Sequence, residues 1–224
     1  MSLTPSLDRL IHQLQKLPGV GPKNAQRLAI FMFKKGADFS RDLSEAIVEM
    51  ASSVRYCGVC FGICESDVCE ICSNNLRDHC KICVVEKPTD VFHIEATGQY
   101  NGVYHVLNGL ISPLEYLTID KLNIRSLVSK LNADDCTVGE IVFALPPKVE
   151  GDATMALIKK MIKRPFEISR LAQGIPTGCE IEHIDSMTLA RALNNRHQMD
   201  ADKKAVNPAP GDSSQGVHQT KLIQ

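Results

Sequence analysis

Four of the nine cysteines have the spacing of a metal site. Cys57, Cys60, Cys69 and Cys72 form the pattern C-x2-C-x8-C-x2-C. Each C-x2-C can fold into a knuckle that directs two thiolates at one ion, and two knuckles complete a tetrahedron. Four soft thiolates with no open position favour structural Zn²⁺ over a catalytic metal; an iron–sulfur cluster and an incidental redox pair are the alternatives. The spacing therefore predicts one structural zinc per chain.

The other five cysteines do not extend this pattern. Cys64 lies between the two knuckles, where it could compete as a ligand, but its spacing is irregular and we expect a free thiol. Small buried side chains are expected at Cys80, Cys83, Cys136 and Cys179. The odd total argues against a closed disulfide framework, and clustered cysteines in a reducing compartment indicate metal ligands.

A glycine-containing segment near the N-terminus could bind phosphate. In LPGVGPKNAQRLA (17–29), Gly19 and Gly21 can take positive φ, and Pro22 suits the first turn of a following helix. The N-terminus of that helix would present N–H groups and a positive dipole end to an anion. Lys23 and Arg27 are four residues apart, share one helix face and could neutralise neighbouring phosphates without reading base sequence. The alternative is an ordinary helical hairpin with solvated charges.

Three carboxylates follow predicted strands and raise an enzymatic alternative. Glu86 ends the strand ICVVE, while Glu150 and Asp152 follow the strand 140–145. Carboxylate oxygens at strand ends suit Mg²⁺, as in a metal-dependent nuclease or topoisomerase-like enzyme. The sequence has E-G-D here instead of D-x-D at a strand end, and no phosphate loop of the type G-x-x-x-x-G-K-[ST]. None of the four tyrosines stands in an evident nucleophile context; they are Tyr56, Tyr100, Tyr104 and Tyr116. We therefore expect no catalysis.

Hydrophobic periodicity predicts the elements that position these residues. Helices are expected over 6–15, 22–35, 41–53, 88–98, 120–132 and 149–163, with Gly36 as a C-cap. Strands are expected over 81–86, 102–109, 140–145 and 168–174, and a short strand and a helix over 180–197. Strands that alternate with helices indicate an α/β unit around a parallel sheet.

The composition limits the class of protein. The chain has 224 residues, of which 44% are hydrophobic and 23% charged, as in ordinary globular proteins. The net charge is −1, so any DNA contact should be local. The segment from Asp8 to Lys35 contains six basic residues and one acidic residue, so such a contact is expected near the N-terminus. The sequence has neither an apolar run of the roughly 20 residues that cross a bilayer nor a secretory signal. We expect a cytoplasmic protein with a disordered polar tail over 198–224.

The order of these segments resembles one known family. LPGVGPKNAQRLA looks like a helix-hairpin-helix motif and stands before the four-cysteine finger. Three further segments follow the finger: ICVVEKPTDVFHIEATGQYNGVYHVLNG, VEGDAT and RLAQGIPTGCEIEHIDSMTLARAL. The order of all these segments closely resembles the RecR family over residues 7–197. Pro146 departs from it, because the family usually has asparagine there; proline lacks that amide and a backbone donor.

The resemblance implies an α+β multidomain fold. Its parts are expected to be a helical helix-hairpin-helix domain over 1–53, a C4 zinc finger over 54–78, an α/β Toprim domain with a mainly parallel sheet over 79–176, a C-terminal Walker-B-like segment over 177–197 and the tail. RecR-like proteins assemble as dimers and ring-shaped tetramers that can encircle DNA. Such a ring would bring the basic faces of several subunits to one channel.

The resemblance also implies a function without turnover. RecR-like proteins act with RecO and RecF to help RecA displace single-strand-binding protein at gaps, so a nucleoid-associated location is expected. The residues expected to contact DNA are Gly19, Gly21, Lys23 and Arg27. The family's acidic surface docks RecO, and this role transfers to Glu86, Glu150 and Asp152, with a solvated acidic rim as the alternative. A Mg²⁺-dependent enzyme and a purely protein-binding scaffold remain the competing functions.

Overall fold

The computed structural model describes residues 4–112 and 119–196. The chain divides into two compact units, Met1–Ala172 and Gln173–Gln224. The predicted disordered tail and Tyr116 lie outside the described residues. Within the described part of the chain, no helix is both long and apolar enough to span a bilayer.

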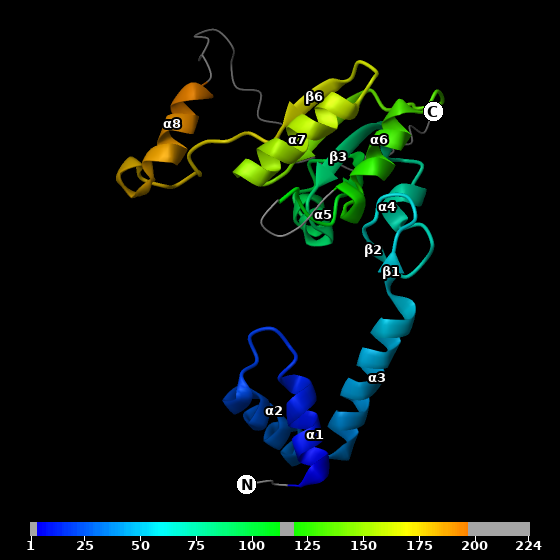
Figure 1. Cartoon of the computed structure of the whole chain (residues 1–224), viewed down its shortest axis with the longest axis vertical. Helices are drawn as coiled ribbons and strands as arrows, with labels where there is room; N and C mark the ends of the chain where they lie inside the picture. The colour runs from blue at the N-terminus through cyan, green and yellow to red at the C-terminus, as the bar shows by residue number, and fades with distance from the viewer. Residues whose placement is uncertain (1–3, 113–118, 197–224) are drawn as a thin grey trace, which may run out of the picture. The chain divides into compact units, whose positions relative to one another are not determined.

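Three helices form the N-terminal part of the first unit (Figure 1). They are α1 (Pro5–Leu14), α2 (Pro22–Lys35) and α3 (Ala37–Ser53). In α2, Ala25 and Ala29 are buried. Gly36, with φ of 93°, ends α2 and also precedes the first residue of α3. The predicted start of α3 after Ser40 is therefore wrong: Ser40 lies in its first turn and bonds back to the Gly36 carbonyl.

The cysteine-rich segment folds into two very short strands and one helical turn. β1 (Arg55–Tyr56) pairs antiparallel with β2 (Ile63–Cys64), and α4 (Glu70–Ser73) follows. Hydrophobic periodicity predicted none of these elements, because strands of two residues and a single helical turn are too short to show a repeating pattern of apolar residues.

A four-stranded parallel sheet forms the centre of the first unit, in the order β4-β3-β5-β6. Its strands are β3 (Asp78–Val85), β4 (Gly102–Val106), β5 (Glu140–Ala144) and β6 (Glu167–Arg170). Its connecting helices are α5 (Pro88–Glu95), α6 (Ile124–Asn132) and α7 (Val149–Met161). The predicted helix 120–132 is divided, with a 3-10 turn η1 (Ile119–Lys121) before α6. The predicted strand 168–174 is shorter than expected.

The two faces of the sheet bury alternate residues of β3. Ile82 and Val84 pack with α6 and α7, which cover one face (Figure 1). Cys83 and Val85 pack on the other face with Val91 of α5 and with side chains of the cysteine-rich segment. Burial on both faces explains why ICVV is an unbroken apolar run.

Residues 173–196, the described part of the second unit, contain a 3-10 turn and one helix. These are η2 (Ile181–His183) and α8 (Ser186–Asn194), and the Asp185 carboxylate caps α8 by accepting from the N–H groups of Met187 and Thr188. The predicted short strand over 180–185, and with it the Walker-B-like strand, is wrong. Its alternation of polar and apolar residues imitates a strand, but the His183 N–H bonds back to the Glu180 carbonyl at 3.1 Å, which makes a turn.

Candidate nucleic-acid interface and metal centre

The four predicted ligands come together in the cysteine-rich segment. The Sγ atoms of Cys57, Cys60, Cys69 and Cys72 all lie within 4.8 Å of one another, and those of Cys60 and Cys69 are 3.6 Å apart. Zinc–sulfur bonds of about 2.3 Å in a tetrahedron place sulfur atoms roughly 3.8 Å apart. The distances therefore fit a single four-coordinate zinc ion.

Backbone N–H groups point at these sulfurs. The Cys57 Sγ accepts from the N–H of Val59 at 3.4 Å and from that of Cys69 at 3.3 Å. The Gly62 N–H lies 3.4 Å from the Cys60 Sγ. Such donors favour the thiolate over the thiol, which is the form that binds metal.

The thiols cannot all ionise without a cation. A hydrogen bond with Cys72 lowers the pKa of Cys60 to about 5, despite the opposing effect of burial. Burial, and then the charge on Cys60, raise the pKa of Cys69 to about 11. The pKa of Cys72 is raised, first by its hydrogen bond to Cys60 and then by burial. The Cys60 thiolate therefore forms readily, whereas Cys69 and Cys72 require a soft dication beside them, as the chemistry of a structural zinc site provides.

The remaining cysteines differ in their surroundings. Cys64 is a free thiol, as predicted, and its Sγ donates to the Ser66 carbonyl at 2.9 Å. Cys83 is buried in the core and Cys136 is half-buried, but Cys80 and Cys179 are exposed, so the prediction of buried side chains is wrong for these two. Cys80 lies in the first half of β3, which the helices leave uncovered, and Cys179 lies in the turn before η2.

The hairpin between α1 and α2 is built on one left-handed glycine. Gly19 has φ of 77°, and the Val20 N–H bonds to the Leu17 carbonyl at 3.1 Å. Proline at the second position and glycine at the third are typical of a type II turn. Gly21 does not use the positive φ that glycine permits: its φ is −77°, because Gly21 is the N-cap of α2 and its carbonyl accepts from the Ala25 N–H.

The N-terminus of α2 combines several features that favour an anion. Gly21 supplies no side-chain cap to the first-turn N–H groups, and that turn contains no acidic residue. Lys23 and Arg27 are both exposed, one helical turn apart. Free N–H groups, the positive dipole end and two adjacent cations together favour a phosphate.

The three predicted acidic residues do not converge. Glu86 is half-buried after β3, and Glu150 is half-buried in the first turn of α7. Asp152 is exposed and pairs with the Arg170 guanidinium at 3.2 Å. Among the described residues, two groups of ligand atoms are close enough together to hold a metal ion: the four cysteines, and an exposed set at the start of η2 and within it, Glu180, Glu182 and His183. The structure therefore does not gather Glu86, Glu150 and Asp152 into the metal site that the enzymatic alternative needs.

Comparison with known proteins decides the family. Models of the RecR helix-hairpin-helix, the RecR four-cysteine zinc finger, the Toprim domain and the RecR C-terminal region match residues 7–51, 54–74, 80–172 and 174–197. A recombination protein RecR from Bifidobacterium longum subsp. infantis is 43% identical over 195 residues, which are 86% of this chain and 96% of the relative. The chain belongs to the RecR family. It is also similar to recombination proteins RecR of Gloeothece citriformis (43% identity, 88% of this chain and 98% of the relative) and of a Prochlorococcus marinus strain (42%, 88% and 96%).

Membership in the RecR family assigns the parts described above. The three N-terminal helices are the helix-hairpin-helix part, residues 54–74 are a four-cysteine zinc finger with one structural zinc, and the parallel sheet belongs to a Toprim domain. The chain is a recombination protein of the RecR type.

Sequence reasoning missed several close contacts within and between these parts. Arg77, between the finger and β3, pairs with Glu95 at the end of α5. Phe61 of the finger packs against His105 of β4. Gly151 lies so close to Pro146 that a Cβ there would be 2.1 Å from the Pro146 carbonyl oxygen. The first two contacts join segments too far apart in the chain for a local sequence pattern to predict them, and the third depends on how the chain turns between β5 and α7.

Proposed function

We propose that this RecR-family chain is a non-catalytic, DNA-binding recombination mediator. It acts in the cytoplasm, on the nucleoid, with RecO and RecF to promote RecA loading on gapped single-stranded DNA. The observation that carries the proposal is the N-terminus of α2, which lacks a side-chain cap and has the exposed Lys23 and Arg27 beside it. Gly19 and Gly21 shape the turn that exposes it.

The chemistry of this surface favours binding without sequence preference. Lysine, arginine and helix N-terminal N–H groups contact phosphates, which carry no sequence information. One hairpin offers only a few such contacts, so a useful affinity requires several hairpins on one DNA. A homodimer or a ring-shaped homotetramer supplies them, and it reconciles DNA binding with a net charge of −1.

A second surface on the Toprim domain is proposed to dock RecO. Glu86 directly follows β3, Glu150 and Asp152 lie in the first turn of α7, and none of the three is fully buried. Spread carboxylates suit a basic protein surface better than one metal ion, because each can meet a separate lysine or arginine. Charge reversal by Glu86→Lys should weaken RecO binding, whereas Glu65→Lys in the zinc finger should not; equal RecO affinity of both variants and the wild type would contradict the assignment.

The DNA site is tested by charge reversal with a matched control. Fluorescence anisotropy at low salt would compare the wild type with Lys23→Glu/Arg27→Glu, using gapped and single-stranded oligonucleotides. The control Lys159→Glu/Lys160→Glu changes the net charge equally at exposed positions in the last turn of α7. We expect the hairpin variant to lose at least about tenfold in affinity, in line with the weight of phosphate contacts. An unchanged affinity of the hairpin variant would exclude the hairpin as the DNA site.

A further inference from the structure

The zinc finger covers the free edge of the Toprim sheet. β4 is the last strand on its side of the sheet, and the Val106 N–H at the end of β4 donates to the Cys60 carbonyl at 2.8 Å. An edge strand has open N–H and C=O groups that proteins usually cover or blunt. Here the covering group is the backbone of a metal ligand, so the geometry of the knuckle and that of β4 are joined directly.

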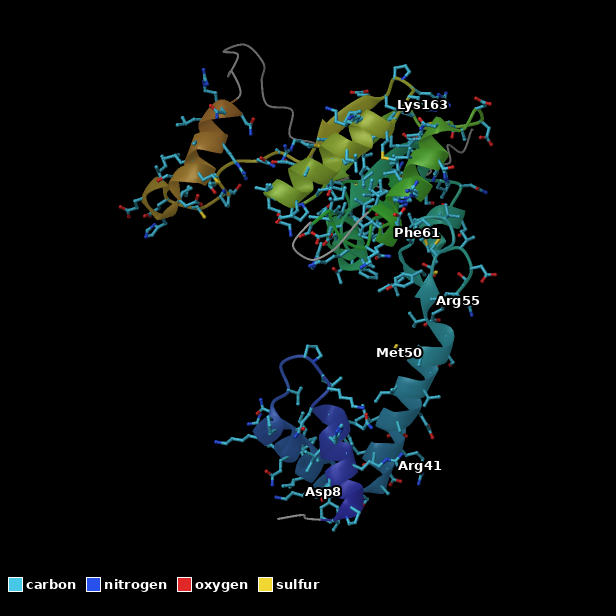
Figure 2. The ribbon with its side chains drawn as sticks, in the orientation of Figure 1. Asp8, Arg41, Met50, Arg55, Phe61 and Lys163 are labelled. Atoms are coloured by element: carbon cyan, nitrogen blue, oxygen red, sulfur yellow. The ribbon has the colours of Figure 1, made fainter. Side chains whose placement is uncertain are left out.

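Phe61 joins the two parts a second time. It follows Cys60 and has φ of 62°, a backbone conformation that a bulky L residue rarely adopts. Its ring meets the His105 ring edge-on, with centroids 5.3 Å apart and an interplanar angle of 71°. Figure 2 labels Phe61 on the finger, beside the Toprim domain. The knuckle therefore keeps a strained residue in place, and that residue packs on the edge strand.

His105 is a polar residue in an apolar position. Its side chain is fully buried, and its Nε2 lies 2.9 Å from the Asn123 carbonyl, so Nε2 carries the proton and donates. Its Nδ1 has no hydrogen-bond partner among the described residues. Burial lowers the pKa of His105 to about 4, so the ring is neutral at physiological pH. An unpaired buried nitrogen is costly, so the ring contact with Phe61 and the hydrogen bond to Asn123 have to offset that cost.

Asn123 connects His105, through hydrogen bonds, to the segment that follows β4 and reaches the carboxyl end of β3. Its side-chain amide donates to the Val106 carbonyl at 2.9 Å, and its N–H donates to the Leu107 carbonyl at 3.1 Å. The Leu107 N–H in turn bonds to Val85, and the Gly109 N–H bonds to the carbonyl of Glu86 at 3.2 Å. An unbroken set of contacts therefore runs from the zinc ligand Cys60 to the backbone of Glu86.

We propose that His105 is a positioning residue through which zinc binding and the β3–β4 edge stabilise each other. When zinc is bound, the finger holds Phe61 against His105, and His105 holds Asn123 and the segment that bonds to Glu86. Loss of zinc loosens this edge, and loosening of the edge lowers the affinity for zinc, because such coupling is reciprocal. The inference rests on the zinc site and not on the proposed DNA or RecO contacts.

The first test measures zinc affinity by competition with a chelator of known affinity. The change His105→Ala should weaken zinc binding by about tenfold, within the usual range of coupling between sites. The matched control is His93→Ala, which removes an exposed histidine on α5 of the same domain. Equal zinc affinities in His105→Ala and the wild type would overturn the proposal.

The second test begins with the wild type, so its first comparison does not depend on the folding of a variant. Hydrogen exchange of the wild type is compared with and without zinc at the amides of Leu107 and Gly109, which do not bond to the finger itself. Their exchange should rise by about tenfold or more after chelation, while helix α7 serves as the internal reference. In His105→Ala, removal of zinc should have little further effect on these amides. Unchanged exchange in the chelated wild type, or a full zinc effect in the variant, would show that no coupling runs through His105.

Discussion

At the scale of single residues, the two hairpin glycines have different requirements. Gly19 needs the left-handed backbone region, with φ of 77°, whereas Gly21 has φ of −77° and a Cβ added there would meet no atom within 4 Å. An L residue pays a steric cost at the first position and none at the second. The same chemical change should therefore have opposite results two residues apart.

We predict that Gly19→Ala lowers the free energy of unfolding by about 1 kcal/mol, and that Gly21→Ala leaves it unchanged or raises it slightly. Urea denaturation followed by the helical circular dichroism signal would measure both, each variant serving as the control for the other. Both alanines retain Lys23 and Arg27, so DNA affinity should fall only where the turn is disturbed. A Gly21→Ala variant that is as unstable as Gly19→Ala would contradict the observed turn.

Sequence reasoning at this scale succeeded where the determinants are local. The zinc ligands were predictable because C-x2-C fixes a knuckle by itself, and two knuckles leave one arrangement for Cys57, Cys60, Cys69 and Cys72. The φ of Gly21 was not, because glycine permits both hands and the helix start decides between them. The exposure of Cys80 depends on where the helices stop covering β3, which its neighbours in sequence do not show.

At the scale of elements, an ion pair joins the finger linker to the Toprim domain. The Arg77 guanidinium lies 3.0 Å from the Glu95 Oε1 at the end of α5 and also donates to the Tyr100 carbonyl at 3.1 Å. The Tyr104 hydroxyl donates to the same carboxylate at 2.6 Å. The Arg77 and Glu95 side chains are only 15% and 26% exposed, so neither charge is easily solvated if the other is removed.

We predict that Glu95→Gln lowers the free energy of unfolding at pH 7 by about 2 kcal/mol, the usual weight of hydrogen bonds to charged groups. The Arg77 hydrogen bond lowers the pKa of Glu95 below its ordinary 4.5. The stabilisation by the ionised Glu95 is therefore fully present above the ordinary pKa of 4.5 and is lost as the pH falls through the lowered pKa. Urea denaturation at neutral and acidic pH should show the gap between wild type and variant closing on acidification.

The matched control for this prediction is Glu45→Gln on the exposed surface of α3. It makes the same chemical change where no buried arginine depends on the carboxylate, so it should alter stability by less than about 0.5 kcal/mol. A gap between wild type and Glu95→Gln that stays constant with pH would mean that the charge of Glu95 contributes nothing to the fold.

Most elements followed from the hydrophobic period, and the segment EIEHID is an instructive exception. The sequence predicted β3, β5 and α7 close to their observed positions. An element that buries one or two of its faces has a clear pattern of apolar residues, and such a pattern can be recognised in the sequence. The segment EIEHID has the same alternation as a strand, but its N–H groups close a local turn instead of pairing with another strand. Pairing is a property of the assembled fold, so pattern alone could not reject that strand.

At the scale of the whole molecule, the weak net charge means that DNA affinity depends on how many hairpins contact the same DNA. A single chain at net charge −1 has no long-range attraction for DNA, and each hairpin offers one lysine and one arginine at the phosphate site. Binding strength must then grow with the number of subunits that contact the same DNA. The salt dependence of binding counts those contacts, since each neutralised phosphate releases counterions.

We predict that Lys23→Ala reduces the slope of log affinity against log salt by about 0.9 for every hairpin on duplex DNA. The reduction should thus be about 1.8 for an engaged dimer and about 3.6 for a tetrameric ring. Anisotropy titrations over a range of salt would give the slope, and solution mass measurement with and without DNA would give the number of subunits. Because the mass counts subunits and the slope counts only those that touch phosphate, the two numbers agree if the hairpins line a common DNA channel. A tetrameric mass with a slope change near 0.9 would place three of four hairpins off the DNA and would eliminate the ring as the DNA-binding form.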